Sequence, residues 1–209
     1  MKKAVIWDLD GTLFDSYGVI VESLCLTLQE QGIIIPMEEI HHYAIAFSIR
    51  SLFDKVSKER GVPAEGLQQR YSQISGNKYL DIQPMPNAIE TLSALNERGI
   101  ENYVFTHRGK TTTPVLENLK MCSFFKAVIT SQSGFTRKPD PEAILYLLEK
   151  YDLDPDNTYY VGDRSIDMAC AVNSGITGIL YLPEGSIDVS GGGETYIVQD
   201  LKDILAFLA

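Results

Sequence analysis

Two carboxylates directly follow a run of four apolar residues near the start of the chain. The run Ala4–Trp7 has the length and composition of a buried strand, and Asp8, Asp10 and Gly11 come immediately after it. In open α/β sheets, ligands bind in the crevice at the carboxyl ends of the strands, so acids at this point are placed for chemistry. Like charges this close need a cation or a shared proton, and Mg²⁺ suits carboxylate oxygens. The alternative interpretation is an ordinary Asp-Gly turn.

Three later segments place polar side chains at comparable points. Thr106 closes a second strand-like run, Lys138 lies just before an expected helix, and Asp163 and Asp167 follow a third run. A hydroxyl can donate to a phosphate oxygen, an ammonium can neutralise carboxylates, and acids four residues apart can approach one ion. Taken singly, each has an ordinary explanation: a strand-end cap, a solvated charge, or an acid that complements a helix dipole.

Together, and in this order, these motifs resemble the haloacid dehalogenase-like hydrolase superfamily. The pattern is Asp-x-Asp-Gly-Thr, a strand-terminal Thr, a Lys, and Gly-Asp-x-x-x-Asp, and it covers essentially the whole chain. Four motifs in the right order on successive strand ends make coincidence improbable. The resemblance implies a Rossmann-like parallel α/β sheet flanked by helices, with a small α-helical cap domain. It also implies a phosphatase that acts on a small phosphorylated metabolite of the phosphoglycolate or sugar-phosphate type.

The resemblance assigns the two acids of the first motif different roles. Asp8 would be the nucleophile that forms an aspartyl-phosphate, and Asp10 the general acid and base that protonates the leaving group and then activates water. Dehalogenating relatives lack the second acid, so its presence favours phosphate esters. A carboxylate that attacks a phosphate dianion meets charge repulsion, which nearby cations must offset.

The remaining motif residues would bind the phosphoryl group and the metal, by the same resemblance. Thr106 and Lys138 would hold the phosphoryl group and so belong to the catalytic set. Mg²⁺ is the implied cofactor, and four acids would hold it: Asp8, Asp10 through its backbone carbonyl, Asp163, and Asp167 either directly or by supporting the other ligands.

One segment departs from the usual pattern. Many relatives follow the strand-terminal Thr with Asn, whereas this chain has His107 and Arg108 after Thr106. His107 could donate to the phosphate or the substrate, and a pKa near neutrality would make that contact sensitive to pH. A loop histidine without a role is the alternative. Arg108 could bind an anionic group or face water, and the sequence assigns it no role.

The apolar spacing divides the chain into a core that is interrupted once. After the first motif the spacing is helical, with breaks at 32–36 and near Gly61 and Gly76, and no strand is expected before Pro84. The expected division is an α/β core of residues 1–15 and 84–209 and a helical cap of residues 16–83.

In the core, strands alternate with helices, which predicts a parallel sheet covered on both faces. We expect one helix to begin at Asn87, with Glu90 in a capping box, and another to have Asp140 as N-cap and Pro141 in its first turn. The other expected strands are Lys126–Thr130, Thr158–Val161, Ile176–Leu182 and Glu194–Val198. The glycine-rich stretch 185–193 leads into a strand rather than a helix, so a phosphate cradle is not expected there.

The helical insertion resembles the cap of the phosphoglycolate phosphatase and β-phosphoglucomutase-like branch. Such a cap would exclude water and contact the part of the substrate beyond the phosphate. Within it, 48–51 resembles the loop that reaches the active site in relatives, where Arg50 could bind a carboxylate or phosphate through two donors. Alternatively, Arg50 opens a helix on the solvent face.

Charge and cysteine content limit the partners. The net charge of −10 argues against nucleic acid and anionic membranes, and no segment has the length of a membrane span. Three cysteines without metal-ligand spacing indicate reduced thiols in a cytoplasmic protein. We expect a monomer or a small homo-oligomer. Two alternatives are a phosphosugar mutase, which would share every motif, and a non-catalytic phosphate-binding regulatory protein, against which the intact Asp8, Asp10, Lys138 and Asp163 argue.

Overall fold

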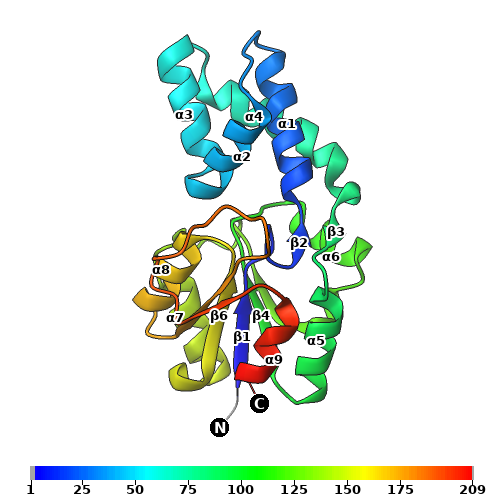
Figure 1. The fold of residues 1–209 in the computed structure, drawn as a ribbon, viewed down its shortest axis with the longest axis vertical. Coiled ribbons are helices and arrows are strands. Elements are labelled where there is room, and N and C mark those ends of the chain that lie inside the picture. The colour runs from blue at the N-terminus through cyan, green and yellow to red at the C-terminus, as the bar shows by residue number, and fades with distance from the viewer. Residues whose placement is uncertain (1–2, 209) are drawn as a thin grey trace. The chain divides into compact units, whose positions relative to one another are not determined.

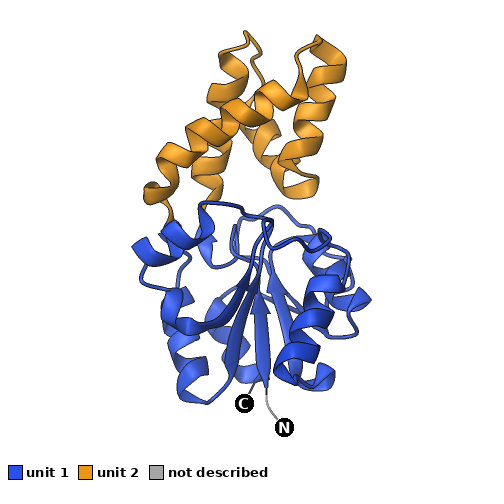
Figure 2. Cartoon of the chain, turned by 180° about the vertical axis from the view of Figure 1, so that it is seen from behind, with its two compact units in different colours: residues 1–15, 83–209 blue, residues 16–82 orange. Residues whose placement is uncertain are grey.

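The computed structural model describes residues 3–208, and these residues form two compact units. One unit comprises Met1–Asp15 and Gln83–Ala209, and the other comprises Ser16–Ile82 (Figure 2). The division between 82 and 83 lies one residue before the boundary expected from the sequence. We call the first the α/β unit and the second the helical unit, and describe each by itself.

A six-stranded sheet forms the centre of the α/β unit. The strands lie in the order β5-β4-β1-β6-β7-β8, and each neighbouring pair is parallel. Strand β1 is buried on both faces, as expected for a central parallel strand. The strand bounds are β1 Ala4–Trp7, β4 Glu101–Phe105, β5 Phe125–Ile129, β6 Thr158–Gly162, β7 Thr177–Tyr181 and β8 Tyr196–Val198.

The register of the three central strands determines which side chains meet. Trp7 of β1 is level with Val104 of β4 on one side and with Val161 of β6 on the other. Residues that follow these strands by one or two positions therefore lie at one edge of the sheet. Asp8, Thr106 and Asp163 occupy these positions.

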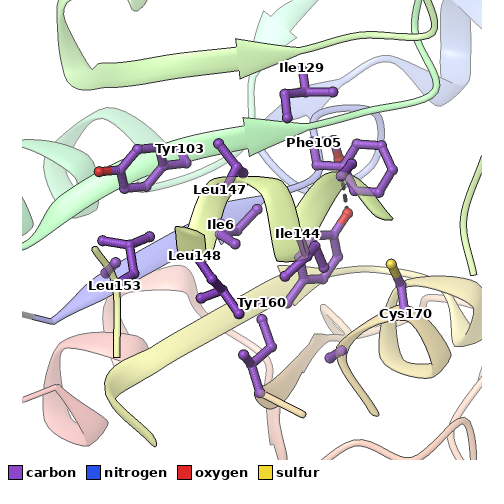
Figure 3. Packing of buried hydrophobic residues seen from close by; sticks show 14 of the residues in the cluster. Ile6, Tyr103, Phe105, Ile129, Ile144, Leu147, Leu148, Leu153, Tyr160 and Cys170 are labelled. Atoms are coloured by element: carbon purple, nitrogen blue, oxygen red, sulfur yellow. Dashed lines mark hydrogen bonds between the residues drawn. The ribbon is translucent and has the colours of Figure 1, made fainter. Parts of the chain in front are cut away.

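Helices cover both faces of the sheet (Figure 1), so the predicted α/β class is confirmed. On one face, Ile144 and Leu147 of α7 pack against Ile6, Tyr103 and Tyr160 of the central strands (Figure 3). On the other face lie α5 and α9, which contact each other. The helices of this unit are α5 Ala88–Glu97, α6 Thr112–Asn118, α7 Glu142–Tyr151, α8 Ser165–Asn173 and α9 Ile204–Phe207.

Two predicted helix starts differ from the structure. Asn87 is the N-cap residue of α5, but it has a positive φ of 62° and its side chain makes no capping hydrogen bond; its Nδ2 donates to both carboxylate oxygens of Asp200 at 3.0 and 2.9 Å. The predicted capping box is therefore wrong. Helix α7 begins at Glu142, so Pro141, and not Asp140, is the N-cap residue. Asp140 lies one position before this cap, and its Oδ1 accepts a hydrogen bond from the Glu142 N–H at 3.0 Å.

The helical unit is built from four helices around their own apolar core. Leu24 and Leu28 of α1 pack with Phe53 and Val56 of α3. The stretch predicted to end near Gly76 continues two residues further, because α4 ends at Lys78; the break at Gly61 is confirmed, with a φ of 72° that ends α3. The bounds are α1 Tyr17–Gln29, α2 Met37–Ala46, α3 Ile49–Arg60 and α4 Ala64–Lys78.

Two short strands that the sequence did not predict join the chain segments on either side of the insertion. Strand β2, Phe14–Asp15, pairs antiparallel with β3, Gln83–Pro84. Each strand is two residues long, so it carries no periodic pattern that sequence reasoning could detect. The pairing holds together, within the α/β unit, the two points where the chain leaves and returns.

Candidate active site

The two acids of the first motif lie on a tight turn after β1. The N–H groups of Leu13 and Phe14 both donate to the Leu9 carbonyl, at 2.9 and 2.8 Å, and Gly11 has a φ of 79°. Glycine adopts this conformation without steric cost, so the turn explains its position in the motif. Asp8 is buried, and its N–H donates to the Val161 carbonyl of β6 at 2.9 Å. The Asp-Gly turn that was the alternative interpretation is present, and it presents both acids at the sheet edge.

A buried lysine lies between two buried acids. The Nζ of Lys138 is 3.0 Å from Oδ1 of Asp8 and 2.7 Å from Oδ1 of Asp167, and the lysine side chain is 2% exposed. The rings of Phe105 and Tyr160 each lie 5.3 Å from this ammonium, measured to the ring centroid. Ionic contacts and aromatic faces thus hold the ammonium in one place.

Burial and the neighbouring charges shift the pKa of Lys138 in opposite directions. Burial alone would lower the pKa of Lys138, but the carboxylates of Asp167 and Asp8 outweigh it and raise the pKa. Burial raises the pKa of Asp167, and Lys138 opposes this shift. Lys138 is therefore a permanent cation at the carboxyl edge of the sheet.

Three acids at this edge form a possible metal site. Carboxylate oxygens of Asp8, Asp163 and Asp167 lie within 4.8 Å of one another. With all three carboxylates ionised, they and the ammonium of Lys138 would sum to a charge of −2, which a divalent cation would balance. The donors are hard oxygens, which Mg²⁺ prefers. The residues present therefore fit such an ion.

Neighbouring groups orient the acids of this cluster. The hydroxyl of Thr12, which is fully buried, donates to Oδ1 of Asp163 at 3.0 Å. The N–H of Arg164 donates to Oδ2 of Asp167 at 3.2 Å, and the hydroxyl of Tyr160 lies 3.4 Å from its Oδ1. Asp167 lies in the first turn of a helix, α8. It is fully buried and paired with Lys138, so more than the helix dipole determines its position.

Gly162 makes room for Asp167. A Cβ atom at Gly162 would lie 2.4 Å from Cβ and 2.5 Å from Cγ of Asp167. We expect Gly162→Ala to displace Asp167 and lower the free energy of unfolding by about 1–3 kcal/mol, as overpacking typically does. Denaturant titration measures this change. Gly66→Ala is the matched control, because nothing lies within 4 Å of a Cβ there, inside α4; equal effects of the two variants would contradict the steric account.

Thr106 begins the tripeptide that departs from the usual pattern. It is buried after β4, and its N–H donates to the Ile129 carbonyl of β5 at 3.0 Å. Its Oγ1 accepts from the Arg108 N–H at 3.2 Å, which leaves the hydroxyl proton available to a ligand oxygen. The structure thus places Thr106 at the same sheet edge as Asp8 and Asp163, as the register requires.

His107 does not behave as predicted. Its Nε2 accepts a hydrogen bond from the backbone N–H of Lys138 at 2.9 Å, so this nitrogen carries no proton. Burial, together with the charges of Lys138, Arg137 and Arg164, lowers its pKa from 6.5 to about 2. The expected pH sensitivity near neutrality is wrong, because the ring stays neutral there; a contact of His107 with the substrate stays a prediction. His107 instead holds the backbone of Lys138.

The low pKa of His107 predicts a loss of stability in acid. The unfolded imidazole binds a proton below about pH 6.5 while the folded one does not until about pH 2. Stability from this group is therefore complete above pH 6.5 and falls by about 1.4 kcal/mol per pH unit below it. In unfolding measurements from pH 7 to pH 5, we expect His107→Gln to lose less stability than wild type; parallel losses would contradict this.

Arg108, which the sequence left without a role, forms an ion pair with Asp10. Its Nη2 lies 2.7 Å from Oδ1 of Asp10, and its Nε lies 3.0 Å from Oδ1 and 3.2 Å from Oδ2. The Asp10 side chain is therefore directed to Arg108 rather than to the three-acid cluster. No sequence signal pointed to this pair, because the departure from Thr-Asn concerns the neighbouring position, His107.

Arg50 differs from expectation in its local structure. Segment 48–51 is not a loop, because Ser48 is the N-cap of α3 and its Oγ accepts from the Ser51 N–H at 3.0 Å. Arg50 is the second residue of this helix. Its guanidinium donates to Asp54 at 3.1 Å and Glu65 at 3.3 Å, both in the helical unit, and its side chain is 56% exposed.

The glycine-rich loop binds a carboxylate of its own. The Gly191 N–H donates to Oε1 of Glu194 at 2.6 Å, and backbone N–H groups of this loop lower the pKa of Glu194. These amides are therefore occupied, which agrees with the expectation that the loop is no phosphate cradle.

In the described part of the chain, none of the helices combines the length and apolar character needed to cross a membrane.

A parallel sheet with buried carboxylates and a buried lysine at its carboxyl edge defines the class: an α/β enzyme with its active site at that edge. The family model for haloacid dehalogenase-like hydrolases matches residues 5–181. The chain belongs to this family, and the enzyme class expected from its motifs, a phosphoric monoester hydrolase, is confirmed.

Individual relatives agree with this assignment. A phosphoglycolate phosphatase from Agrobacterium fabrum is 29% identical over 187 residues, which are 86% of this chain and 80% of the relative. The pyrophosphatase PpaX of Oceanobacillus iheyensis is 24% identical over 99% of this chain and 96% of its own. A hydrolase structure from Pseudomonas syringae has a TM-score of 0.80 at 27% identity, covering 99% of this chain and 98% of the other.

Proposed function

We propose that this enzyme is a Mg²⁺-dependent phosphatase that hydrolyses a small phosphorylated metabolite through an aspartyl-phosphate on Asp8. The observation that carries the proposal is the buried ion pair between Lys138 and Asp8, 3.0 Å apart at the carboxyl edge of the sheet. A lysine on the surface would gain little stability from such a contact, and burying the charge of a lysine costs desolvation energy. This arrangement supports a nucleophile beside a cation that binds the phosphoryl group.

In the first half of the reaction, a carboxylate oxygen of Asp8 forms a bond to phosphorus, and the bond between phosphorus and the leaving oxygen breaks. Asp10 gives its proton to that oxygen. Lys138 and the hydroxyl of Thr106 hold the phosphoryl oxygens and offset the repulsion between the two anions. Such proton transfer typically contributes about 10²–10⁴-fold to the rate.

In the second half, water attacks the phosphorus of the aspartyl-phosphate, and the bond to Asp8 breaks. Asp10, now deprotonated, takes the proton of the attacking water, which restores both acids to their starting state. Asp8, the backbone carbonyl of Asp10 and Asp163 would hold Mg²⁺, with Asp167 in support. When bound, the ion would neutralise charge on the phosphoryl oxygens.

The substrate class rests on the relatives and on the balance of charge. Relatives are named phosphoglycolate phosphatase and pyrophosphatase, so we propose phosphoglycolate or a sugar phosphate as substrate, with pyrophosphate as the comparison. Because the chain carries a net charge of −10, local cations such as Lys138 must capture an anionic substrate. Arg50 stays a proposed substrate contact; it would have to leave Asp54 and Glu65 to serve.

A cytoplasmic location is also proposed. All three cysteines are free thiols: Cys25 is partly buried, Cys122 is exposed and Cys170 is buried. Reduced cysteines are usual in the cytoplasm and unusual in oxidising compartments. A small phosphorylated metabolite is the proposed partner, and a monomer or small homo-oligomer stays the expected state.

Phosphate release tests the function. Purified enzyme is assayed with 2-phosphoglycolate, glucose 6-phosphate and pyrophosphate, each with added Mg²⁺ and with a chelator. The proposal expects release that requires the ion and that favours one of the two phosphate esters. Release that continues unchanged in chelator would refute metal dependence, and no release from any compound would refute the proposed function.

A further inference from the structure

The carboxylate of Asp10 is bound by a guanidinium through three short contacts. Two of these, at 2.7 and 3.0 Å, reach Oδ1, and the third, at 3.2 Å, reaches Oδ2. The Arg108 side chain is 10% exposed and that of Asp10 is 23% exposed, so water competes little for either group. A guanidinium that binds a carboxylate through two nitrogens determines the plane of the carboxylate as well as its distance.

Arg108 is itself held from several directions. Its N–H donates to Oγ1 of Thr106 at 3.2 Å, and its carbonyl accepts from the Ser131 N–H at 3.1 Å. The remaining guanidinium nitrogen, Nη1, donates to Oγ1 of Thr111 at 2.8 Å, and Cζ lies 5.9 Å from the centroid of the Phe14 ring. The backbone and the guanidinium of Arg108 are thus held before any ligand binds.

This arrangement matters because Asp10 has to move a proton along a defined direction. A general acid must lie within about 2.6–3.2 Å of the atom it protonates, and errors in its orientation reduce the rate. Arg108 makes its two shorter contacts with Oδ1, which leaves Oδ2 as the oxygen less occupied. The geometry thus selects one oxygen of Asp10 to exchange the proton with the leaving group and then with water.

We propose that Arg108 is a positioning residue that orients Asp10 for both proton transfers. This inference rests on the proposed function, and it assigns a role to a residue that the sequence left without one. In this role Arg108 does not itself hold the phosphoryl group. Its removal should therefore slow the chemical steps while leaving substrate affinity nearly unchanged.

A double-mutant cycle in steady-state kinetics with 2-phosphoglycolate tests the role. We expect Arg108→Ala to lower kcat on the order of 10²-fold, with KM changed by less than about threefold. In the Asp10→Asn background the same change should cost less than a further threefold or so, because the residue it orients is already gone. Arg70→Ala, which removes an exposed partner of Glu30 in the helical unit, is the charge-matched control and should leave kcat unchanged.

A second substrate separates positioning from a general structural effect. p-Nitrophenyl phosphate has a leaving group that needs little protonation, so Arg108→Ala should slow phosphoenzyme formation from it by less than about threefold in a single turnover. Arg108→Lys keeps the charge but loses the two-nitrogen contact, so it should resemble Arg108→Ala. It serves as the test variant if Arg108→Ala does not fold.

Three results would overturn the inference: an unchanged kcat, losses that multiply in the double variant, or a rise in KM at constant kcat, which would make Arg108 a substrate-binding residue. Failure of the proposed function gives a different result, because the wild type would then release no phosphate from any compound. Normal wild-type turnover with normal turnover by Arg108→Ala and Arg108→Lys would refute the positioning role alone.

Discussion

Asp8→Asn is expected to abolish phosphate release, with a loss in kcat on the order of 10⁴-fold or more. The amide has the size of the carboxylate, but it cannot attack phosphorus to form the covalent intermediate. Lys138 keeps its second partner, Asp167, at 2.7 Å, so the fold should persist. Steady-state phosphate release with 2-phosphoglycolate and Mg²⁺ measures the loss.

A matched variant shows whether this loss belongs to the position or to the type of substitution. Asp152→Asn makes the same change at an exposed residue that ends α7 with a φ of 52°, a conformation that asparagine tolerates. It should leave phosphate release within about twofold of wild type, as surface changes usually do. Near-normal turnover by Asp8→Asn would refute the mechanism.

Lys138→Met should have the second largest effect, on activity and on stability together. Methionine fills a similar volume but removes the cation. We expect kcat/KM to fall by about 10³-fold or more, which equals or exceeds the usual loss when one electrostatic contact to the transition state is deleted. The buried carboxylates of Asp8 and Asp167 would lose their shared partner, so we expect the free energy of unfolding to fall by about 3 kcal/mol. Kinetics and denaturant titration without divalent cations measure the two effects.

Lys150→Met provides the control for this variant. The Lys150 ammonium donates to the hydroxyl of Tyr146 at 2.8 Å on the exposed face of α7, where solvent screens it. Its removal should leave activity unchanged and stability within about 0.5 kcal/mol of wild type. If both lysine variants keep wild-type activity, Lys138 does not hold the phosphoryl group.

The α/β architecture could be predicted from sequence because its elements carry strong periodic signals. The run Ala4–Trp7 is a strand with these bounds, and the expected strand at Thr158–Val161 ends one residue later, at Gly162. Local signals failed where a contact with a distant residue orients the side chain instead. Asn87 was expected to start a capping box, yet Asp200, far along the chain, takes its amide.

The candidate site, like the fold, could be predicted from the sequence only in part. The positions of Asp8, Lys138 and Asp163 at one sheet edge follow from motif order and strand register, so the sequence indicated them. The partners of the tripeptide 106–108 could not be read from it, because they depend on three-dimensional contacts. His107 binds the backbone of Lys138 and Arg108 binds Asp10, 31 and 98 positions away in the chain.

The central claim is that Asp8 becomes phosphorylated, and mass spectrometry of the acid-quenched enzyme tests it most directly. Enzyme mixed with Mg²⁺ and 2-phosphoglycolate, or the best substrate of the phosphate-release assay, is quenched within one turnover and digested. The account predicts that the peptide containing Asp8 gains the mass of one phosphoryl group, and that Asp8→Asn gains none. Turnover without this modification, or the modification on a peptide that lacks Asp8, would contradict it.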